Sequence, residues 1–133
     1  MLFDLINEFV MHRQNAISRT SLGSRLYLSC LAQVDGVIGN SSSGLLEVPT
    51  FKKGTINIGD RQRGRLTCSS IINCNPNKNE IMFAINKLFS TEFRGSLDSV
   101  INPNGVAGAS EKLVEVLTNI EISGILKKVF HSV

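Results

Sequence analysis

Two short apolar runs, each ending in glycine and followed at once by polar residues, constrain this chain more than any other feature. The runs are 37–38 and 55–58, and the polar segments that follow them are 39–44 and 59–65. Helical spacing alternates with such runs along the chain, which predicts an α/β fold with a parallel sheet and helices on both faces. Ligands bind beyond the carboxyl ends of the strands in such sheets. We therefore expect both polar segments at one edge, forming a single site.

The periodicity of apolar residues predicts the order of the elements. Helices are expected over 2–13, 25–33, 79–89 and 112–119, with a further short helix and a loop within 91–108. Pro49 should stop the helix that follows the first polar segment within a few residues. Strands are expected over 36–39, 55–58 and 70–74, and 16–18 is a candidate for another. The residues predicted to face inward are Ile81, Met82, Ile85, Leu88, Phe89, Leu113, Val116, Leu117 and Ile120.

Length and composition indicate one soluble globular domain over 1–133. The chain has 133 residues, of which 42% are hydrophobic and 19% charged. Its apolar runs are too short to span a membrane, and its first residues lack the pattern of a secretory signal. We therefore expect no membrane association and a cytoplasmic location.

Charge and cysteine usage argue against two other classes of protein. The net charge is +3, but Lys and Arg are spread along the chain outside 61–65, which disfavours nucleic-acid binding. Cys30, Cys68 and Cys74 are odd in number without CxxC spacing, so we expect reduced thiols in or near the core. His12 and His131 lie near opposite ends of the chain, so no metal site is predicted.

The first polar segment has the composition of a phosphate-binding turn. Its candidate contacts are Asn40, Ser41, Ser42, Ser43 and Gly44. A serine-rich turn at a helix N-terminus presents hydroxyl and backbone N–H donors, and the helix dipole adds partial positive charge. The alternative is that these serines only cap the helix and form the turn.

Glu47 follows in the first helical turn. It either accepts hydrogen bonds from sugar hydroxyls or only complements the helix dipole.

The second polar segment brings three guanidinium groups together between glycines. Arg61, Arg63 and Arg65 offer donors suited to oxyanions. Their alternation along an extended loop implies that they do not all point the same way, so we expect one of them to face the site. A solvated loop in which Asp60 and Gln62 only pair with the arginines is the alternative. No dinucleotide, P-loop or nucleophile-elbow motif and no acid/base carboxylate pair is present.

Several segments resemble the hydrolysing UDP-N-acetylglucosamine 2-epimerases of sialic-acid and capsule biosynthesis. The segments are 37–44 (VIGNSSSG), 47–49 (EVP), 57–65 (NIGDRQRGR), 102–105 (NPNG) and 109–112 (ASEK). The resemblance runs from Leu22 to about Leu117 and implies a Rossmann-like second domain of a glycosyltransferase-B fold, present only in part. The family eliminates UDP and then hydrates the glycal, with inversion at C2.

The resemblance also implies roles for individual residues. Ser41 and Ser42 would contact the diphosphate, Glu47 the ribose hydroxyls and Arg61 the nucleotide. Asn40, Ser43, Gly44 and Gln62 are further candidate contacts. The implied ligand is UDP or a UDP-sugar, and no cofactor is implied. The catalytic residues are unknown and are expected in an upstream region that this sequence lacks.

The sequence departs from the family in two ways. Phe51-Lys52-Lys53-Gly54 stands where the family usually has Phe-Gly-Ile-Pro, and the first domain is absent. The chain is therefore expected to self-associate, or to associate with the missing N-terminal domain, through the apolar segments 1–10 and 122–133. The alternatives are a GDP-linked diacetylbacillosamine 2-epimerase, a non-catalytic binding or remnant module, and a nucleic-acid module.

Overall fold

The computed structural model of this protein describes residues 2–105 and 107–124. Its centre is a three-stranded parallel sheet in the order β1-β2-β3. The strands are β1 (Gly36–Gly39), β2 (Gly54–Ile58) and β3 (Ile71–Cys74). All three were predicted, and their parallel pairing confirms the predicted α/β arrangement.

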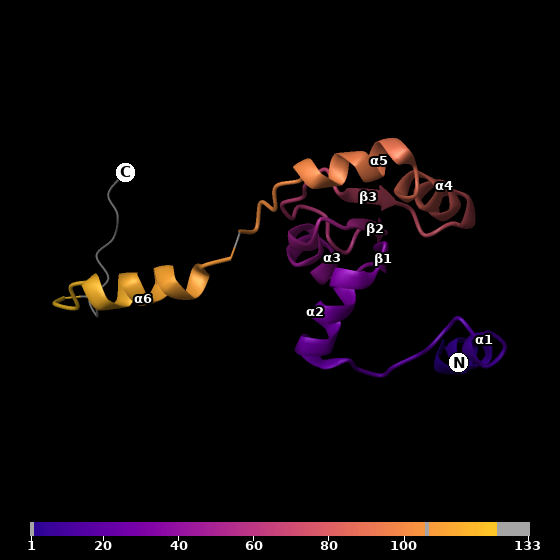
Figure 1. The fold of residues 1–133 in the computed structure, drawn as a ribbon, viewed down its shortest axis with the longest axis horizontal. Helices are drawn as coiled ribbons and strands as arrows, with labels where there is room; N and C mark the ends of the chain where they lie inside the picture. The colour runs from indigo at the N-terminus through magenta and orange to yellow at the C-terminus, as the bar shows by residue number, and fades with distance from the viewer. Residues whose placement is uncertain (1, 106, 125–133) are drawn as a thin grey trace.

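Helices cover the sheet, and the first and last helices of the chain lie away from it (Figure 1). The helices are α1 (Leu2–Met11), α2 (Gly23–Gln33), α3 (Ser43–Leu46), α4 (Lys78–Leu88), α5 (Thr91–Ser96) and α6 (Ala109–Asn119), with 3-10 turns η1 (Val48–Phe51) and η2 (Leu97–Ser99). The prediction of a strand at 16–18 is wrong, because this segment is irregular. Ile17 is 81% exposed there, and the sheet of the described residues contains only β1, β2 and β3.

The main core lies between the sheet and the helices that follow it. Ile56 of β2 and Ile72 of β3 are register partners and therefore point to the same face. They cluster with Ala84 and Leu88 of α4 and with Phe93 of α5, and all five side chains are buried. The apolar positions of α4 and α5 thus hold one face of the sheet.

The opposite face carries α3 and η1, which contact β2, and α2, which contacts η1. Figure 1 shows α2 and α3 on the side of the sheet away from α5. Thr55 alternates with Ile56 along β2, so its side chain points to this second face, where its hydroxyl donates to Gly44 O at 2.8 Å. Leu31 of α2, Leu45 of α3 and Val48 of η1 are each at most 2% exposed. Both faces are therefore covered, which confirms the Rossmann-like arrangement that the alternating pattern predicted.

Two residues that were predicted to face inward on α4 do not. Met82 is 48% and Phe89 51% exposed. The buried stripe of α4 runs through Ala84 and Leu88, one turn apart. Met82 lies two positions before Ala84 and so points away from this stripe, whereas Phe89 lies at the C-cap beyond the last helical turn.

The helices α1 and α6 lie away from the sheet in Figure 1. The prediction that Leu113, Val116, Leu117 and Ile120 face inward is wrong, since each is at least 43% exposed. Periodicity identifies the apolar side of a helix but not the surface that covers it. Association through these segments stays a prediction, and residue 1 and the tail 125–133 lie outside the described residues. No described helix is both long and apolar enough to cross a membrane.

The departure at Phe51-Lys52-Lys53-Gly54 has a conformational consequence. Lys52 ends η1 with φ 55° and ψ 37°, in the left-handed region that glycine adopts most easily. Its ammonium group donates to Val100 O, which ties the turn to the segment after η2. Lys52 therefore holds this turn at some cost in backbone strain.

The N-terminus of α4 is closed by a carboxylate. Asn77 is the N-cap and accepts from Glu80 N at 3.0 Å, while Glu80 accepts from Asn75 N at 2.8 Å. The backbone and side-chain hydrogen bonds from Asn75, and then the one from Asn77, lower the pKa of Glu80 below its ordinary value. The ionised carboxylate is thus the form that the folded chain stabilises.

We predict a pH-dependent effect for Glu80→Gln. A carboxyl whose pKa is lower in the folded state stabilises the fold above its unfolded pKa, and this contribution is lost as pH falls through the folded pKa. The variant should therefore be less stable than the parent chain at pH 7, with a smaller difference in strong acid. Urea unfolding at both pH values measures this, with Glu92→Gln as the control. An equal difference at both pH values would contradict the proposed role of the charge.

Candidate functional site

The serine turn (residues 39–44) and the Arg loop (residues 59–65) follow β1 and β2, which are adjacent and parallel. Gln62 Nε2 in the Arg loop donates to Asn40 O in the serine turn at 2.7 Å. Gln62 is only 5% exposed, whereas Asn40 is exposed, so the bond is partly buried. The prediction that both segments lie at one edge of the sheet is confirmed.

The three serine hydroxyls of the serine turn differ in their hydrogen bonds. Ser43 Oγ is 2.5 Å from Tyr27 Oη of α2, which holds it in place. Ser41 is exposed, and its Oγ accepts from Ser43 N at 3.4 Å. Ser42 is half-buried and is the N-cap of α3 without a side-chain capping bond. Ser41 and Ser42 are therefore the serines whose hydroxyls are best placed to meet a ligand.

The contribution expected from a helix dipole is small. The helix α3 has only 4 residues, and a macrodipole needs aligned peptide units over several turns. Donors at the serine turn are therefore individual hydroxyl and backbone N–H groups rather than a helix terminus.

Gly44 fixes the position of the serine turn on the sheet. A Cβ at Gly44 would lie 2.7 Å from Thr55 Cγ2, which is closer than carbon atoms approach. The side chains of Asn102 and Asn104 hold α3 from the other end, donating to Leu46 O at 2.8 Å and Leu45 O at 3.2 Å. The segment NPNG (102–105) thus holds α3, which follows the serine turn, by hydrogen bonds from residues 56 or more positions away in the chain.

Glu47 and Arg61, which the resemblance placed at the ribose and the nucleotide, are both exposed. Gly59 and Gly64 bracket the Arg loop with φ 77° and 81°, so left-handed glycines set its path at both ends. Because Arg61 immediately precedes the anchored Gln62, its backbone is fixed beside the serine turn. Binding by Ser41, Ser42, Glu47 and Arg61 stays a prediction, as does binding by Asn40, Ser43, Gly44 and Gln62.

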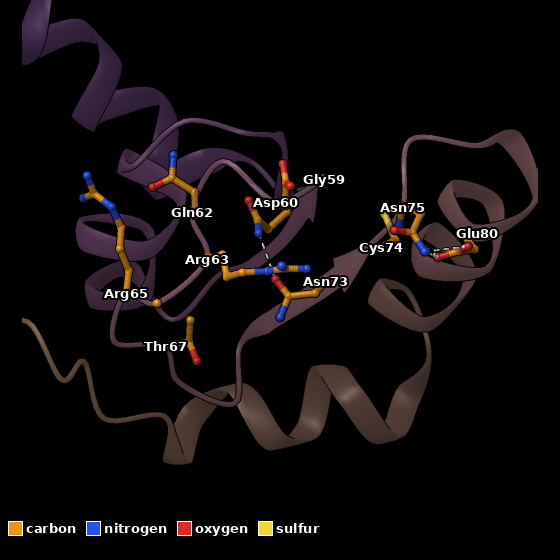
Figure 2. A pocket seen from close by; sticks show the side chains of 12 residues that line it. Gly59, Asp60, Gln62, Arg63, Arg65, Thr67, Asn73, Cys74, Asn75 and Glu80 are labelled. Atoms are coloured by element: carbon orange, nitrogen blue, oxygen red, sulfur yellow. Dashed lines mark hydrogen bonds between the residues drawn. The ribbon is translucent and has the colours of Figure 1, made fainter.

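A polar pocket of about 460 Å³ lies between the Arg loop and the carboxyl ends of β2 and β3 (Figure 2). Its lining residues are Asn57, Gly59, Asp60, Gln62, Arg63, Gly64, Arg65, Thr67, Asn73, Cys74, Asn75 and Glu80. Arg63 extends toward Asn73 in Figure 2. Arg63 and Arg65 line this pocket and Arg61 does not, so the three arginines do not all face the same surface.

Sequence analysis missed the two asparagines at the base of this pocket. Asn57 of β2 and Asn73 of β3 are register partners, and Asn57 Nδ2 donates to Asn73 Oδ1 at 2.8 Å. Asn57 is 5% exposed. The available signal was an amide side chain between two isoleucines in the strand sequence TINI, since buried polar groups need partners.

The cysteines take no part in a metal site or a disulfide in the described part of the chain. Cys30, Cys68 and Cys74 are free and half-buried. Burial, and then the nearby carboxylate of Glu80, raise the pKa of Cys74, so its thiol stays protonated at neutral pH. The described residues hold no group of three or more His, Cys, Asp or Glu side chains suited to a metal ion.

Comparison with known proteins matches residues 2–118 to the family described as UDP-N-acetylglucosamine 2-epimerase. A GDP/UDP-N,N'-diacetylbacillosamine 2-epimerase (hydrolyzing) of Campylobacter jejuni is 39% identical over 95% of this chain and 34% of its own length. The polysialic acid biosynthesis protein P7 of Escherichia coli is 46% identical over 62% of this chain and 21% of its own.

A UDP-N-acetylglucosamine 2-epimerase of Neisseria meningitidis is 29% identical over 79% of this chain and 28% of its own length. The chain thus spans between about a fifth and a third of the length of these relatives.

Proposed function

We propose, since the chain belongs to the UDP-N-acetylglucosamine 2-epimerase family, that it is the nucleotide-binding part of a hydrolysing epimerase. The whole enzyme would convert UDP-N-acetylglucosamine and water to N-acetylmannosamine and UDP. The observation that carries this proposal is the bond from Gln62 to Asn40 O, which holds the Arg loop against the serine turn at the sheet edge. A cytoplasmic location stays a prediction.

The proposed chemical role of this part is to bind the diphosphate and to stabilise the charge that it gains on leaving. Hydroxyl groups of Ser41 and Ser42 and the guanidinium of Arg61 are donors to oxyanions. Glu47 is an acceptor suited to the ribose hydroxyls. Proton transfer at the sugar needs acid and base groups, which we expect in an upstream region. Among the described residues the one histidine is His12, directly after α1, and α1 lies away from the sheet in Figure 1. We assign binding and leaving-group stabilisation to this chain.

We predict that the 133-residue chain binds UDP weakly and does not turn over UDP-N-acetylglucosamine. Binding follows from the donors at the sheet edge. Weak binding follows because Ser41, Glu47 and Arg61 are exposed, so their contacts with the ligand are screened by water and salt. Calorimetric titration with UDP, alongside an assay for UDP release, measures both expectations.

Three outcomes of this experiment discriminate the candidate functions. If the folded chain does not bind UDP at millimolar concentration, the proposed site is wrong. Sustained release of UDP would exclude the non-catalytic module. GDP in place of UDP tests the alternative that the name of the Campylobacter relative suggests, because a GDP-linked substrate predicts tighter binding of GDP.

A further inference from the structure

The last three backbone carbonyls of α3 each accept a hydrogen bond from a side chain that is distant in the chain. The bonds run from Thr55 Oγ1 to Gly44 O at 2.8 Å, from Asn104 Nδ2 to Leu45 O at 3.2 Å and from Asn102 Nδ2 to Leu46 O at 2.8 Å. Each donor lies at least 11 positions from its acceptor. The carbonyl end of this helix is therefore capped by tertiary contacts and not by the residues that follow it.

The sequence after α3 explains why these donors are needed. A longer helix would satisfy Leu45 O with the N–H of the residue four positions on, but that residue is Pro49, which has no N–H. Thr50 N, which would bond Leu46 O in a longer helix, donates to Glu47 O at 3.0 Å instead. A helix of 4 residues is also far below the length at which a helix is stable by itself in water. The position of α3 therefore depends on tertiary contacts, and the three side-chain donors are among them.

The two asparagines lie in a segment that is itself fixed. Val100, two positions before Asn102, is 2% exposed and belongs to the main core. Asn102 Oδ1 accepts from Asn104 N at 2.9 Å. Because a backbone N–H only donates and a backbone carbonyl only accepts, the orientation of the Asn102 amide follows from its two partners. The segment NPNG thus connects α3 on one face of the sheet to the core on the other face.

The serine turn shares backbone hydrogen bonds with α3, so the two move together. The bonds run from Leu45 N and Leu46 N to Ser42 O at 2.9 and 3.0 Å and from Glu47 N to Ser43 O at 3.0 Å. Ser42 is also the N-cap of α3, and its hydroxyl makes no capping bond. A displacement of α3 is therefore a displacement of the hydroxyl and N–H donors that we assign to the diphosphate.

We propose that Asn102 and Asn104 are positioning residues for the serine turn. By capping the carbonyl end of α3 they keep Ser41 and Ser42 in the arrangement that meets a diphosphate, although neither asparagine belongs to the serine turn or to the Arg loop. Binding groups have to be held to within about 0.5 Å of the productive geometry, so loss of a cap should lower affinity without loss of any ligand contact. The effect on binding rests on the proposed function, whereas the effect on α3 does not.

Hydrogen exchange of backbone amides tests the effect on α3 without a ligand. In Asn102→Ala, we expect the amides of Leu45, Leu46 and Glu47 to exchange at least about tenfold faster than in the parent chain, because α3 opens locally. The amide of Ile56 in β2 should exchange at a rate within about twofold of that in the parent chain, because the main core stays intact. Unchanged exchange in α3 would overturn the proposal. Equally faster exchange in α3 and β2 would also overturn it, since Asn102 would then only stabilise the fold as a whole.

Calorimetric titration with UDP tests the effect on binding. Asn102→Ala should weaken UDP binding by about fivefold, and Asn104→Ala by about two- to threefold, because the bond from Asn104 is the longer one. Asn102→Asp keeps the acceptor for Asn104 N but lacks the donor to Leu46 O, so it should bind UDP no better than Asn102→Ala. Asn86→Ala is the matched control, because it removes an exposed asparagine of α4 and should change neither affinity nor exchange in α3.

The outcomes separate this inference from the proposed function. If the parent chain and Asn102→Ala bind UDP equally well, the positioning role is wrong and the proposed function stands. If exchange in α3 responds to Asn102→Ala but the parent chain does not bind UDP, the asparagines hold α3 and the proposed function is wrong. Asn104 is exposed, so Asn104→Ala should fold and gives the same two readouts if Asn102→Ala does not fold.

Discussion

Arg61→Ala is expected to weaken the binding of UDP to this chain by about tenfold or more, because loss of a charged hydrogen-bond partner is worth about 1.5–3 kcal/mol. Its exposure favours the lower end of this range, since salt screens an exposed contact. Arg61 lies beside the anchored Gln62 and outside the polar pocket. Arg63→Ala should weaken UDP binding less, because Arg63 lines the polar pocket and does not directly precede the Gln62 that bonds the serine turn.

Calorimetric titration of UDP into the parent chain and both variants measures this difference. Arg61 is exposed, so its replacement should leave the fold intact, and the sheet can be checked by circular dichroism. Arg25→Ala controls for the loss of one positive charge outside the Arg loop, on α2. Equal affinities for the parent chain, Arg61→Ala and Arg63→Ala would mean that the Arg loop does not contact the nucleotide.

Ile56→Ala should cause the largest loss of stability, about 2–5 kcal/mol, which is typical when a large buried side chain is truncated. Ile56 is 1% exposed at the centre of β2, the middle strand, where it packs in one cluster with Ile72, Ala84 and Leu88. A cavity there would loosen the contact of β2 with α4. A domain of this size is often only about 5–15 kcal/mol more stable than its unfolded chain, so the variant should unfold at a clearly lower urea concentration than the parent chain.

Urea unfolding followed by circular dichroism tests this expectation. Ile17→Ala makes the same chemical change at a side chain that is 81% exposed, and its effect should stay within about 0.5 kcal/mol. A loss of similar size for both variants would show that the cluster around Ile56 is not the core. The comparison therefore tests the sheet and its covering helices without any ligand.

The strands and the edge that carries the site were predictable because their signals are local. The runs 37–38, 55–58 and 70–74 are apolar, are bounded by turn residues and alternate with helical spacing, which leaves a parallel sheet as the simple arrangement. Parallel strands bring their carboxyl ends to one edge, so the order of the chain was enough to place the serine turn beside the Arg loop. Periodicity does not specify a ligand; the expectation of UDP or a UDP-sugar came from the motifs that resemble the epimerase family.

The errors on α4 and α6 share one cause, which is that periodicity does not identify the partner of an apolar surface. Leu113, Val116 and Leu117 form an apolar stripe on α6, yet each is at least 58% exposed. Met82 is apolar at a helical interval but lies off the buried stripe of α4. In each case the pattern described the helix correctly, and the neighbour that would bury its side chains lay beyond the reach of the pattern.

The sequence by itself determined the sheet, its direction and the two polar segments at its carboxyl edge, because apolar runs, glycines and chain order act over a few residues. Only the tertiary structure decided which side chains meet. The bond from Gln62 to Asn40 joins positions 22 apart, and the one from Asn57 to Asn73 joins positions 16 apart. Such contacts depend on the register of β2 and β3 and on the path of the loop between its left-handed glycines. These long-range contacts position Gln62, Asn57 and Asn73 in the lining of the polar pocket, and no local pattern specifies them.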